Sequence, residues 1–351
     1  MTSLRTRALL AFTGVLALSA GAGAAEKLIE TVPGPDFNVG GTPVIQNVAF
    51  TTDQPVTGVG FTARWTAVVA DNENGIAPWS LDLGVRVTAP DGAMTPLWKP
   101  IGGDVTIADY PLQDYRAGMF ESVDGQGEFE WRFTSIGPPW VAGLRNVQYH
   151  LTTTVPDVVE VTNGSTLEGP TWNRPFFIAG ISGLGPVVYQ VRPFRVSVSG
   201  GYRFHSVVSN GNNFTFLYQG DFNAATPLAN LLDYGLGNGN APNGTPQGTS
   251  LIEAMLFEGV DYYFVNSQWD RFSPGTPYTN TITGPGELLP ITTDCPGDAN
   301  GDGVVDFADL SAVLSDFGQS GPDLPGDVNG DGEVNFADLS LVLANFGVDC
   351  N

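Results

Sequence analysis

The feature that most limits how this chain can fold is an acidic segment of twelve residues that occurs twice, 29 residues apart. Residues 298–309 read DANGDGVVDFAD, and residues 327–338 read DVNGDGEVNFAD. Both copies carry Asp or Asn at positions 1, 3, 5, 9 and 12, and glycine at position 6. Calcium prefers about six to eight oxygen ligands, and calcium loops of this length supply them at positions 1, 3, 5, 7, 9 and 12, with glycine at the sharp turn. The repeat therefore predicts two calcium-binding loops, one ion in each.

Each loop offers side-chain oxygens and one backbone carbonyl as calcium ligands. The first set is Asp298, Asn300, Asp302, the Val304 carbonyl, Asp306 and Asp309. The second set is Asp327, Asn329, Asp331, the Glu333 carbonyl, Asn335 and Asp338. The first set has four carboxylates and the second has three, because Asn335 stands where the first loop has Asp306. Since affinity follows ligand charge, the first loop is expected to bind calcium more tightly.

A helix is predicted after each loop but not before it. Apolar residues follow the loops at helical spacing, first Phe307, Leu310, Val313, Leu314 and Phe317, then Phe336, Leu339, Val342, Leu343 and Phe346. Gly318 and Gly347 stand where glycine caps a helix C-terminus. Proline and glycine precede both loops, so each expected unit is a loop followed by one helix.

The doubled Asp-x-Asn-x-Asp-Gly loops, aspartate at position 12 and the missing entering helices resemble the dockerin family over residues 295–350. The resemblance implies calcium-dependent folding and docking onto a cohesin domain, often in polysaccharide-degrading assemblies. Dockerins commonly carry small polar recognition residues at loop positions 10 and 11. This chain has phenylalanine and alanine there in both copies, which leaves the particular cohesin partner open.

The ends of the chain indicate export and a disulfide. Arg5 and Arg7, the apolar residues 8–18 and the small residues 20–25 follow one another in the order of a signal peptide cleaved before Glu26. The alternative is a buried N-terminal helix. The apolar stretch is shorter than the roughly 20 residues that span a bilayer, so we expect a secreted or cell-surface protein without a transmembrane anchor.

Cys295 and Cys350 are the only cysteines in the sequence. An exported protein meets an oxidising environment, so we expect a disulfide between them. Flanking cysteines also resemble a dockerin subtype at the C-termini of exported bacterial proteins.

The rest of the chain predicts a mainly β protein. Apolar and polar residues alternate in runs such as 59–69, 80–88 and 128–133, which is typical of strands with one buried face. We expect a signal peptide (1–25), a β-sandwich or jelly-roll-like domain (26–170), a second β-sandwich (171–286), a linker (287–294) and the small α calcium module (295–351). Residues 176–286 resemble a pre-peptidase C-terminal-like β-sandwich through runs at 216–223, 227–231, 259–265 and 278–286. That family is usually an accessory, non-catalytic module.

Charge and motifs narrow the function classes. A formal net charge of −23 disfavours nucleic-acid partners and anionic membrane surfaces. No nucleophile elbow, zinc-protease motif or phosphate loop occurs, and the histidines, His150 and His205, lie in strand-like runs typical of structural residues. Carboxylate pairs such as Glu128/Glu130 and Asp82/Asp91 could in principle hydrolyse a glycosidic bond. Their alternation with apolar residues is more typical of the solvent-exposed face of a strand. The sequence leans towards a non-catalytic role without deciding whether the protein is an enzyme.

Three functions remain open from the sequence. The first is a secreted, non-catalytic β-sandwich protein attached to a cohesin-bearing scaffold or surface assembly through its calcium module. The second is a carbohydrate-binding or glycoside-hydrolysing subunit of a polysaccharide-degrading complex. Its candidate sugar-stacking residues are the tryptophans near turns, Trp79, Trp98, Trp140, Trp172 and Trp269. The third is a module that serves only as a sorting and retention signal.

Overall fold

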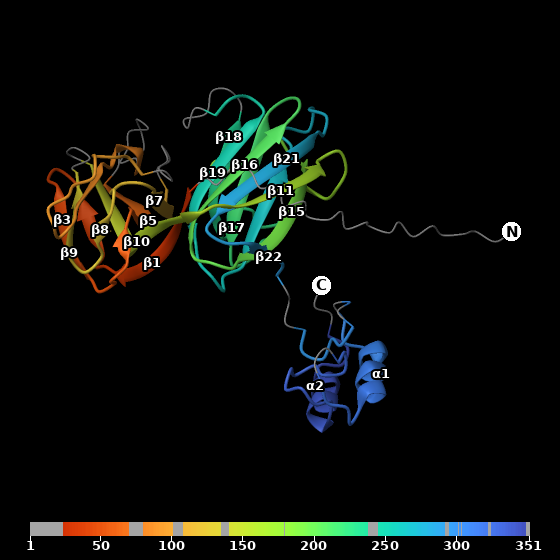
Figure 1. Ribbon diagram of the computed structural model, residues 1–351. Helices are drawn as coiled ribbons and strands as arrows, with labels where there is room; N and C mark the ends of the chain where they lie inside the picture. Colours follow the sequence, from red (N-terminus) through yellow and green to blue (C-terminus); the bar gives the residue numbers. More distant parts are fainter. Residues whose placement is uncertain are drawn as a thin grey trace. The chain divides into compact units, whose positions relative to one another are not determined.

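The structure is a computed structural model that describes residues 24–69, 80–100, 108–134, 140–178, 180–237, 245–291, 295–300, 302, 304–321 and 324–348. The chain forms two compact units, residues 1–289, called the β unit, and residues 290–351, called the C-terminal module. The predicted mainly β fold is confirmed (Figure 1). The predicted signal peptide lies outside the described residues, except for Ala24 and Ala25. Neither helix of the described chain is long and apolar enough to cross a membrane.

The strands of the β unit come in two halves along the chain. The first half contains β1 (Ala24–Pro33), β2 (Phe37–Val39), β3 (Val44–Phe50), β4 (Pro55–Val56), β5 (Gly58–Val69), β6 (Val85–Thr88), β7 (Tyr110–Arg116), β8 (Val123–Asp124), β9 (Gly127–Phe133) and β10 (Val141–Pro156). The second half contains β11 (Val158–Ser165), β12 (Thr171–Trp172), β13 (Pro175–Phe176), β14 (Gly180–Ile181), β15 (Val187–Val196), β16 (Gly200–Val208), β17 (Asn213–Gln219), β18 (Leu231–Gly237), β19 (Thr249–Leu256), β20 (Tyr262–Ser267), β21 (Pro277–Gly284) and β22 (Leu288–Leu289).

One antiparallel sheet runs through both halves, in the order β11-β21-β16-β1-β10-β5-β7. The halves meet where β1 pairs with β16 at a single position, Lys27 opposite Gly200. In the first half this sheet faces the sheet β3-β9-β6, and the aromatic rings of Phe61, Trp131 and Tyr149 pack between them. In the second half, β16 and its neighbours face the sheet β12-β15-β20-β17-β18, with Phe204 against Phe264. Each half is therefore a two-layer sandwich.

The predicted strand alternation is confirmed in two of its runs and shortened in the third. In β9, Phe129, Trp131 and Phe133 are buried, while Glu128 and Arg132, which alternate with them, are exposed. The predicted strand over 80–88 begins only at Val85, because residues Ser80–Asp82 form a 3₁₀ turn. Asp82 and Asp91 are exposed.

Strands near the predicted domain boundaries pair with strands on the other side of them, which the alternation of apolar and polar residues does not predict. β11, which lies before the predicted boundary at residue 170, pairs along its whole length with β21 of the second half. Within the predicted linker 287–294, β22 pairs with β15. Residues 292–294 of that linker lie outside the described part.

The C-terminal module contains the helices α1 (Phe307–Asp316) and α2 (Phe336–Ala344), as the spacing of apolar residues predicts. Gly318 and Gly347 follow them with positive φ, at 81° and 86°. This is the left-handed conformation that glycine adopts without a steric penalty at a helix end. The core is small: the fully buried apolar side chains in the described part of the module are Val305, Val313, Val334 and Val342.

The two loop–helix repeats of the module pack against each other reciprocally. Val305, at position 8 of the first loop, accepts a backbone hydrogen bond from Gly347 and donates one to Val348. Val334, at the same position of the second loop, makes the same pair of bonds with Gly318 and Gln319. Each loop is thus tied to the segment that follows the other helix, which gives the module an internal pseudo-two-fold symmetry.

Candidate calcium-binding module

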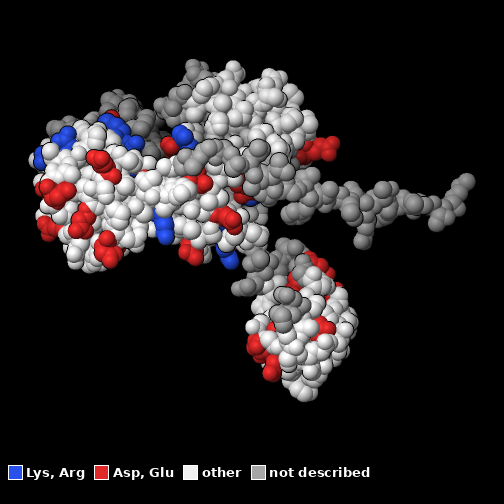
Figure 2. All heavy atoms as spheres, in the orientation of Figure 1, with Lys and Arg blue, Asp and Glu red and all other residues white. Residues whose placement is uncertain are grey.

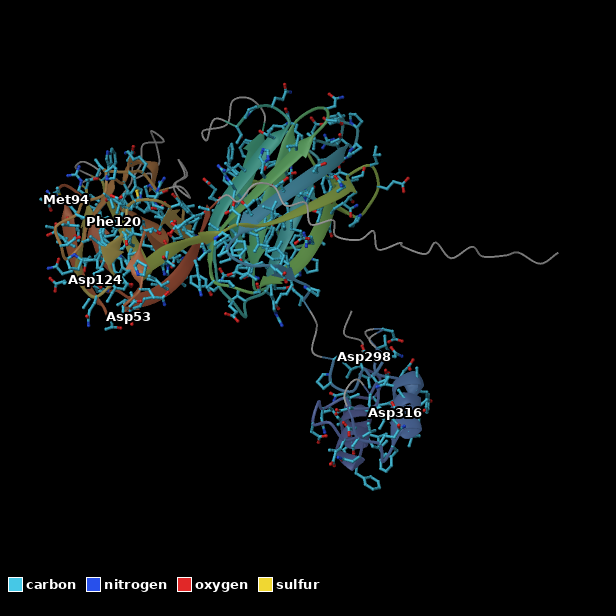
Figure 3. The ribbon with its side chains drawn as sticks, in the orientation of Figure 1. Asp53, Met94, Phe120, Asp124, Asp298 and Asp316 are labelled. Atoms are coloured by element: carbon cyan, nitrogen blue, oxygen red, sulfur yellow. The ribbon has the colours of Figure 1, made fainter. Side chains whose placement is uncertain are left out.

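The loop side chains at positions 1, 3 and 5 fold back onto their own backbone. In the first loop (Asp298 is labelled in Figure 3), the Asn300 Oδ1 accepts from the Asp302 N–H at 2.8 Å. The Asp302 Oδ1 accepts from the Val304 N–H at 3.0 Å. The second loop repeats these two bonds at 2.8 and 2.9 Å. Such bonds between a short polar side chain and a backbone N–H two residues later set the tight curvature of the loop.

The carboxylates at position 12, Asp309 and Asp338, are completely buried. Asp309 accepts from the N–H of Asn300 at 3.1 Å and of Asp306 at 2.7 Å. Asp338 makes the matching bonds with Asn329 at 3.2 Å and Asn335 at 2.8 Å. Each position-12 carboxylate therefore closes its loop by joining positions 3 and 9 to the first turn of the helix.

The position-9 side chains also cap the helices, a role that the calcium-loop pattern alone does not reveal. Asp306 and Asn335 are the N-cap residues of α1 and α2, and their Oδ1 atoms accept from the N–H groups of Ala308 and Ala337 at 2.7 Å. With the aspartate three residues later they form capping boxes. A short polar residue followed three positions on by an acid is the sequence signal that would have predicted them.

The donor chemistry of both loops fits calcium. All side-chain donors are hard oxygens, and the sequence has no Lys, Arg or His after Arg271. A buried carboxylate is costly without a positive partner, so Asp309 and Asp338 lie where a cation would offset that cost. In the described residues, however, no three side chains of the types His, Cys, Asp and Glu lie close enough together to hold a metal ion. The carboxylate oxygens of Asp309 and Asp338 accept hydrogen bonds from backbone N–H groups instead.

The remaining predicted residues of the module are placed as follows. Gly332, at position 6 of the second loop, has φ of 87°, as the sharp turn requires, and Gly303 lies outside the described residues. Cys295 is disulfide-bonded. Cys350, its predicted partner, lies outside the described residues, so the pairing stays a prediction.

The module exposes large apolar side chains that the helical spacing alone would assign to its core. Phe307 is 73% exposed and Phe336 is 72% exposed, and Leu314 and Leu343 are both 56% exposed. The Phe307 ring meets Phe346 edge-on at a centroid distance of 4.9 Å, and the Phe336 ring meets Phe317 in the same way at 5.1 Å. The symmetry of the repeat therefore produces two matching apolar surfaces. Figure 2 shows acidic but no basic side chains on the visible face of this module.

In the β unit, the candidate residues for chemistry take structural positions. His150 is fully buried and bonds Thr31 Oγ1 through Nδ1 at 3.0 Å and Thr62 Oγ1 through Nε2 at 3.2 Å. Burial lowers its pKa to about 3, so the ring is neutral. His205 is half-buried, and burial first, then Arg203, lowers its pKa.

The four tryptophans near turns that the structure describes do not form a common exposed face. Trp98 is buried and donates through Nε1 to Asp114, and Trp172 is buried and donates through Nε1 to Ser267. For these two residues the interpretation as exposed stacking platforms is wrong. Trp140 and Trp269 are half-buried, and Trp79 lies outside the described residues.

Comparisons with known proteins do not assign the chain to a family. No protein-family model matches it, and no curated protein matches it. Two solved structures show a low similarity, and each match covers 76% of this chain and 100% of the other. One is the major capsid protein P2 of bacteriophage PM2, with 9% identity and a TM-score of 0.20. The other is the N-terminal CBM22-1–CBM22-2 tandem domain of Paenibacillus barcinonensis Xyn10C, with 12% identity and a TM-score of 0.22. At these TM-scores neither similarity supports a conclusion about this chain.

Proposed function

We propose that this chain is an exported β-sandwich protein that attaches to a partner protein through its C-terminal module, loaded with two calcium ions. One observation supports this most strongly. Two acidic loops repeat in register, each with a completely buried position-12 carboxylate, in a module without a single positive side chain. Such a module has its own electrostatic reason to take up a divalent cation.

The residues of each loop have separate roles in this proposal. Asp298, Asn300, Asp302 and Asp309 hold the first ion with the Val304 carbonyl and Asp306, and their counterparts Asp327, Asn329, Asp331, the Glu333 carbonyl, Asn335 and Asp338 hold the second. Bound calcium supplies positive charge that offsets repulsion among the carboxylates. The position-12 carboxylates keep the loop closed against the helix, and the position-9 side chains cap the helix.

The docking face in this proposal is the pair of apolar surfaces around Phe307 and Phe336. Large apolar side chains this exposed, grouped on a small unit, are typical of interaction sites. Phe307 and Phe336 are themselves residues of the acidic loops, at position 10, so a partner with an apolar patch and a basic rim is complementary. By the dockerin resemblance, the partner carries a cohesin domain.

A charge exchange at position 9 tests the calcium assignment without disturbing the fold. Asp and Asn are equally good N-caps, so Asp306→Asn and Asn335→Asp keep the caps and change only the ligand charge. We expect Asp306→Asn to weaken the first site by about tenfold and Asn335→Asp to strengthen the second by a similar factor. Calorimetric titration with calcium measures both.

Variants that keep only one intact calcium loop allow the affinity of each site to be measured separately. Asp338→Ala leaves the first loop to report alone, and Asp309→Ala leaves the second. The first loop is expected to bind more tightly; equal or reversed affinities would contradict the argument from ligand charge.

The docking proposal is tested by affinity capture with the chain 26–351 as bait. The organism's envelope and secreted fractions are applied in calcium and eluted with a chelator. We expect a cohesin-bearing protein that the truncated chain 26–289 does not retain. Matched baits Phe307→Ser and Phe336→Ser should reduce capture while calcium titrations stay unchanged. If a module shown to bind calcium retains no calcium-dependent partner, the sorting-signal function is favoured instead.

A further inference from the structure

A second candidate site lies in the β unit, at one end of the second sandwich. A pocket of about 190 Å³ is lined by three loops: the residues after β11, the loop that connects β16 to β17, and the segment between β20 and β21. Loops at the end of a rigid sandwich are a usual place for binding residues. The segment between β20 and β21 approaches the first of these loops closely at Gly275, where a Cβ would lie 2.2 Å from the Thr166 carbonyl oxygen.

The pocket lining is polar and uncharged. Its polar members include Asn210, Asn212, Asn213, Gln268 and Tyr278, and Trp269 adds an aromatic ring. No Asp, Glu, Lys, Arg or His is among the lining residues, in a chain whose formal net charge is −23. A ligand with a formal charge would therefore find no partner of opposite sign, whereas hydroxyl and amide groups would find many partners.

Part of this lining is fixed and part is available. Gln268 holds the pocket wall, because its Oε1 accepts from the Val188 N–H at 3.0 Å and its Nε2 donates to the Thr166 carbonyl at 3.1 Å. Asn213 is 2% exposed, and its Nδ2 donates to the Gly248 carbonyl at 3.4 Å. Among the described residues its Oδ1 has no hydrogen-bond partner. This oxygen is not among the fully buried atoms that lack a partner, so it keeps some solvent exposure, and a ligand group in the pocket can donate to it.

Two further groups are available at the rim. Asn212 accepts from Gln247 at 3.2 Å through Oδ1, while its Nδ2 has no hydrogen-bond partner in the described part of the chain. The indole N–H of Trp269 likewise has none there. Two donor groups and one acceptor are thus available on three residues that line the same pocket.

Trp269 is held rigidly. Its ring packs on Phe214 at a centroid distance of 5.6 Å, and the guanidinium carbon of Arg174 lies 5.1 Å from its centroid. Arg174, itself fully buried, donates through Nε to the Trp269 carbonyl at 3.0 Å. A half-buried ring that neighbouring side chains hold in place can contact a ligand ring at little entropic cost.

We propose that this pocket binds an uncharged polyhydroxylated ring, such as one neutral sugar unit of a glycan. The volume is below the roughly 300–1,000 Å³ of sites for drug-sized ligands, which leaves room for a single ring. Hydroxyl groups both donate and accept, as the available atoms of Asn213, Asn212 and Trp269 require. The site is independent of the calcium module and of its docking role.

The test titrates the isotope-labelled chain 26–351 with methyl glycosides of glucose, galactose, xylose and N-acetylglucosamine, and with glucuronic acid as the charged comparison. The readout is the set of side-chain amide and indole N–H signals, which the variants Asn212→Ala and Trp269→Phe assign. We expect at least one neutral glycoside to bind with a dissociation constant on the order of 1 mM. Its shifts should be confined to pocket residues.

Asn212→Ala and Trp269→Phe should each weaken this binding by roughly two- to tenfold. Asn163→Ala is the matched control, because Asn163 also accepts one side-chain hydrogen bond, from Thr279, but does not line the pocket. Unchanged thermal transitions in all three variants establish that folding is intact. The proposal is overturned if no neutral glycoside binds at about 50 mM, if shifts fall elsewhere, or if glucuronic acid binds better.

Discussion

Removing calcium is expected to unfold the C-terminal module and to leave the β unit folded. The module is small, and its fully buried apolar side chains in the described part are four valines. Units of about 60 residues bury little surface and usually need a disulfide or a metal to be stable. Here the same small interior also holds the carboxylates of Asp309 and Asp338, with no positive side chain in the module. Calcium at about 1,000 times its dissociation constant would add about 4 kcal/mol per site to the stability of the folded module.

Separate probes follow the two units in the intact chain. All seven tryptophans lie before residue 290, so tryptophan fluorescence reports the β unit alone. Both α-helices of the described chain lie in the module, so helical circular dichroism reports the module. With chelator, the helical signal and its thermal transition should disappear, while the fluorescence transition keeps its midpoint.

Two variants connect that result to the loops. Asp309→Ala should remove the response of the first loop and reduce the calcium-induced helical signal to the part that the second loop supports. Asp316→Ala is the control, because Asp316 (Figure 3) is also an aspartate and accepts from the Gly326 N–H at 3.1 Å, but lies outside the loops. It should lower stability slightly and preserve the response to calcium. A helical transition that is identical in calcium and chelator would refute calcium-dependent folding.

The module could be predicted from the sequence because its determinants are local. A calcium loop, a capping box and a helix stop each depend on residues within one turn or one loop, and the repeat shows them twice. The burial of the helix faces could not be predicted in the same way. Phe307 and Leu314 have the spacing of core residues, yet only Val313 on that helix is a fully buried apolar residue. With one short partner helix, the module has too little surface to cover every apolar position.

The sequence predicts that the β unit consists of strands, but it does not predict which strands pair with each other. Alternation marks which residues face inward, but it does not say which strand lies beside which. β11 pairs with β21, more than a hundred residues later in the chain. Trp172 packs against Phe216 and Phe222 and donates to Ser267, 95 residues away. The pocket near Trp269 has the same origin: its three loops are distant in sequence, so no motif announces it.

Acid is expected to destabilise the β unit through His150. The ring is neutral and buried, and burial lowers its pKa from 6.5 to about 3 in the folded state. Between these values the unfolded chain holds a proton that the folded chain does not. Stability contributed by the neutral ring is therefore fully present above pH 6.5 and is lost as the pH falls towards 3. At pH 4.5 the expected loss relative to pH 7 is about 3 kcal/mol.

Urea unfolding followed by tryptophan fluorescence at pH 7 and pH 4.5 measures this loss in the β unit alone. The glutamine of the variant His150→Gln cannot be protonated, and its amide can bond to the threonine hydroxyls at 31 or 62. The loss of unfolding free energy between pH 7 and pH 4.5 should therefore be smaller in this variant than in the unchanged protein, by about 3 kcal/mol. His205→Gln is the matched control, because His205 is only half-buried and its pKa is lowered less by burial. It should leave most of the pH dependence in place. If His150→Gln keeps the full pH dependence, carboxylates rather than this histidine determine the acid sensitivity of the fold.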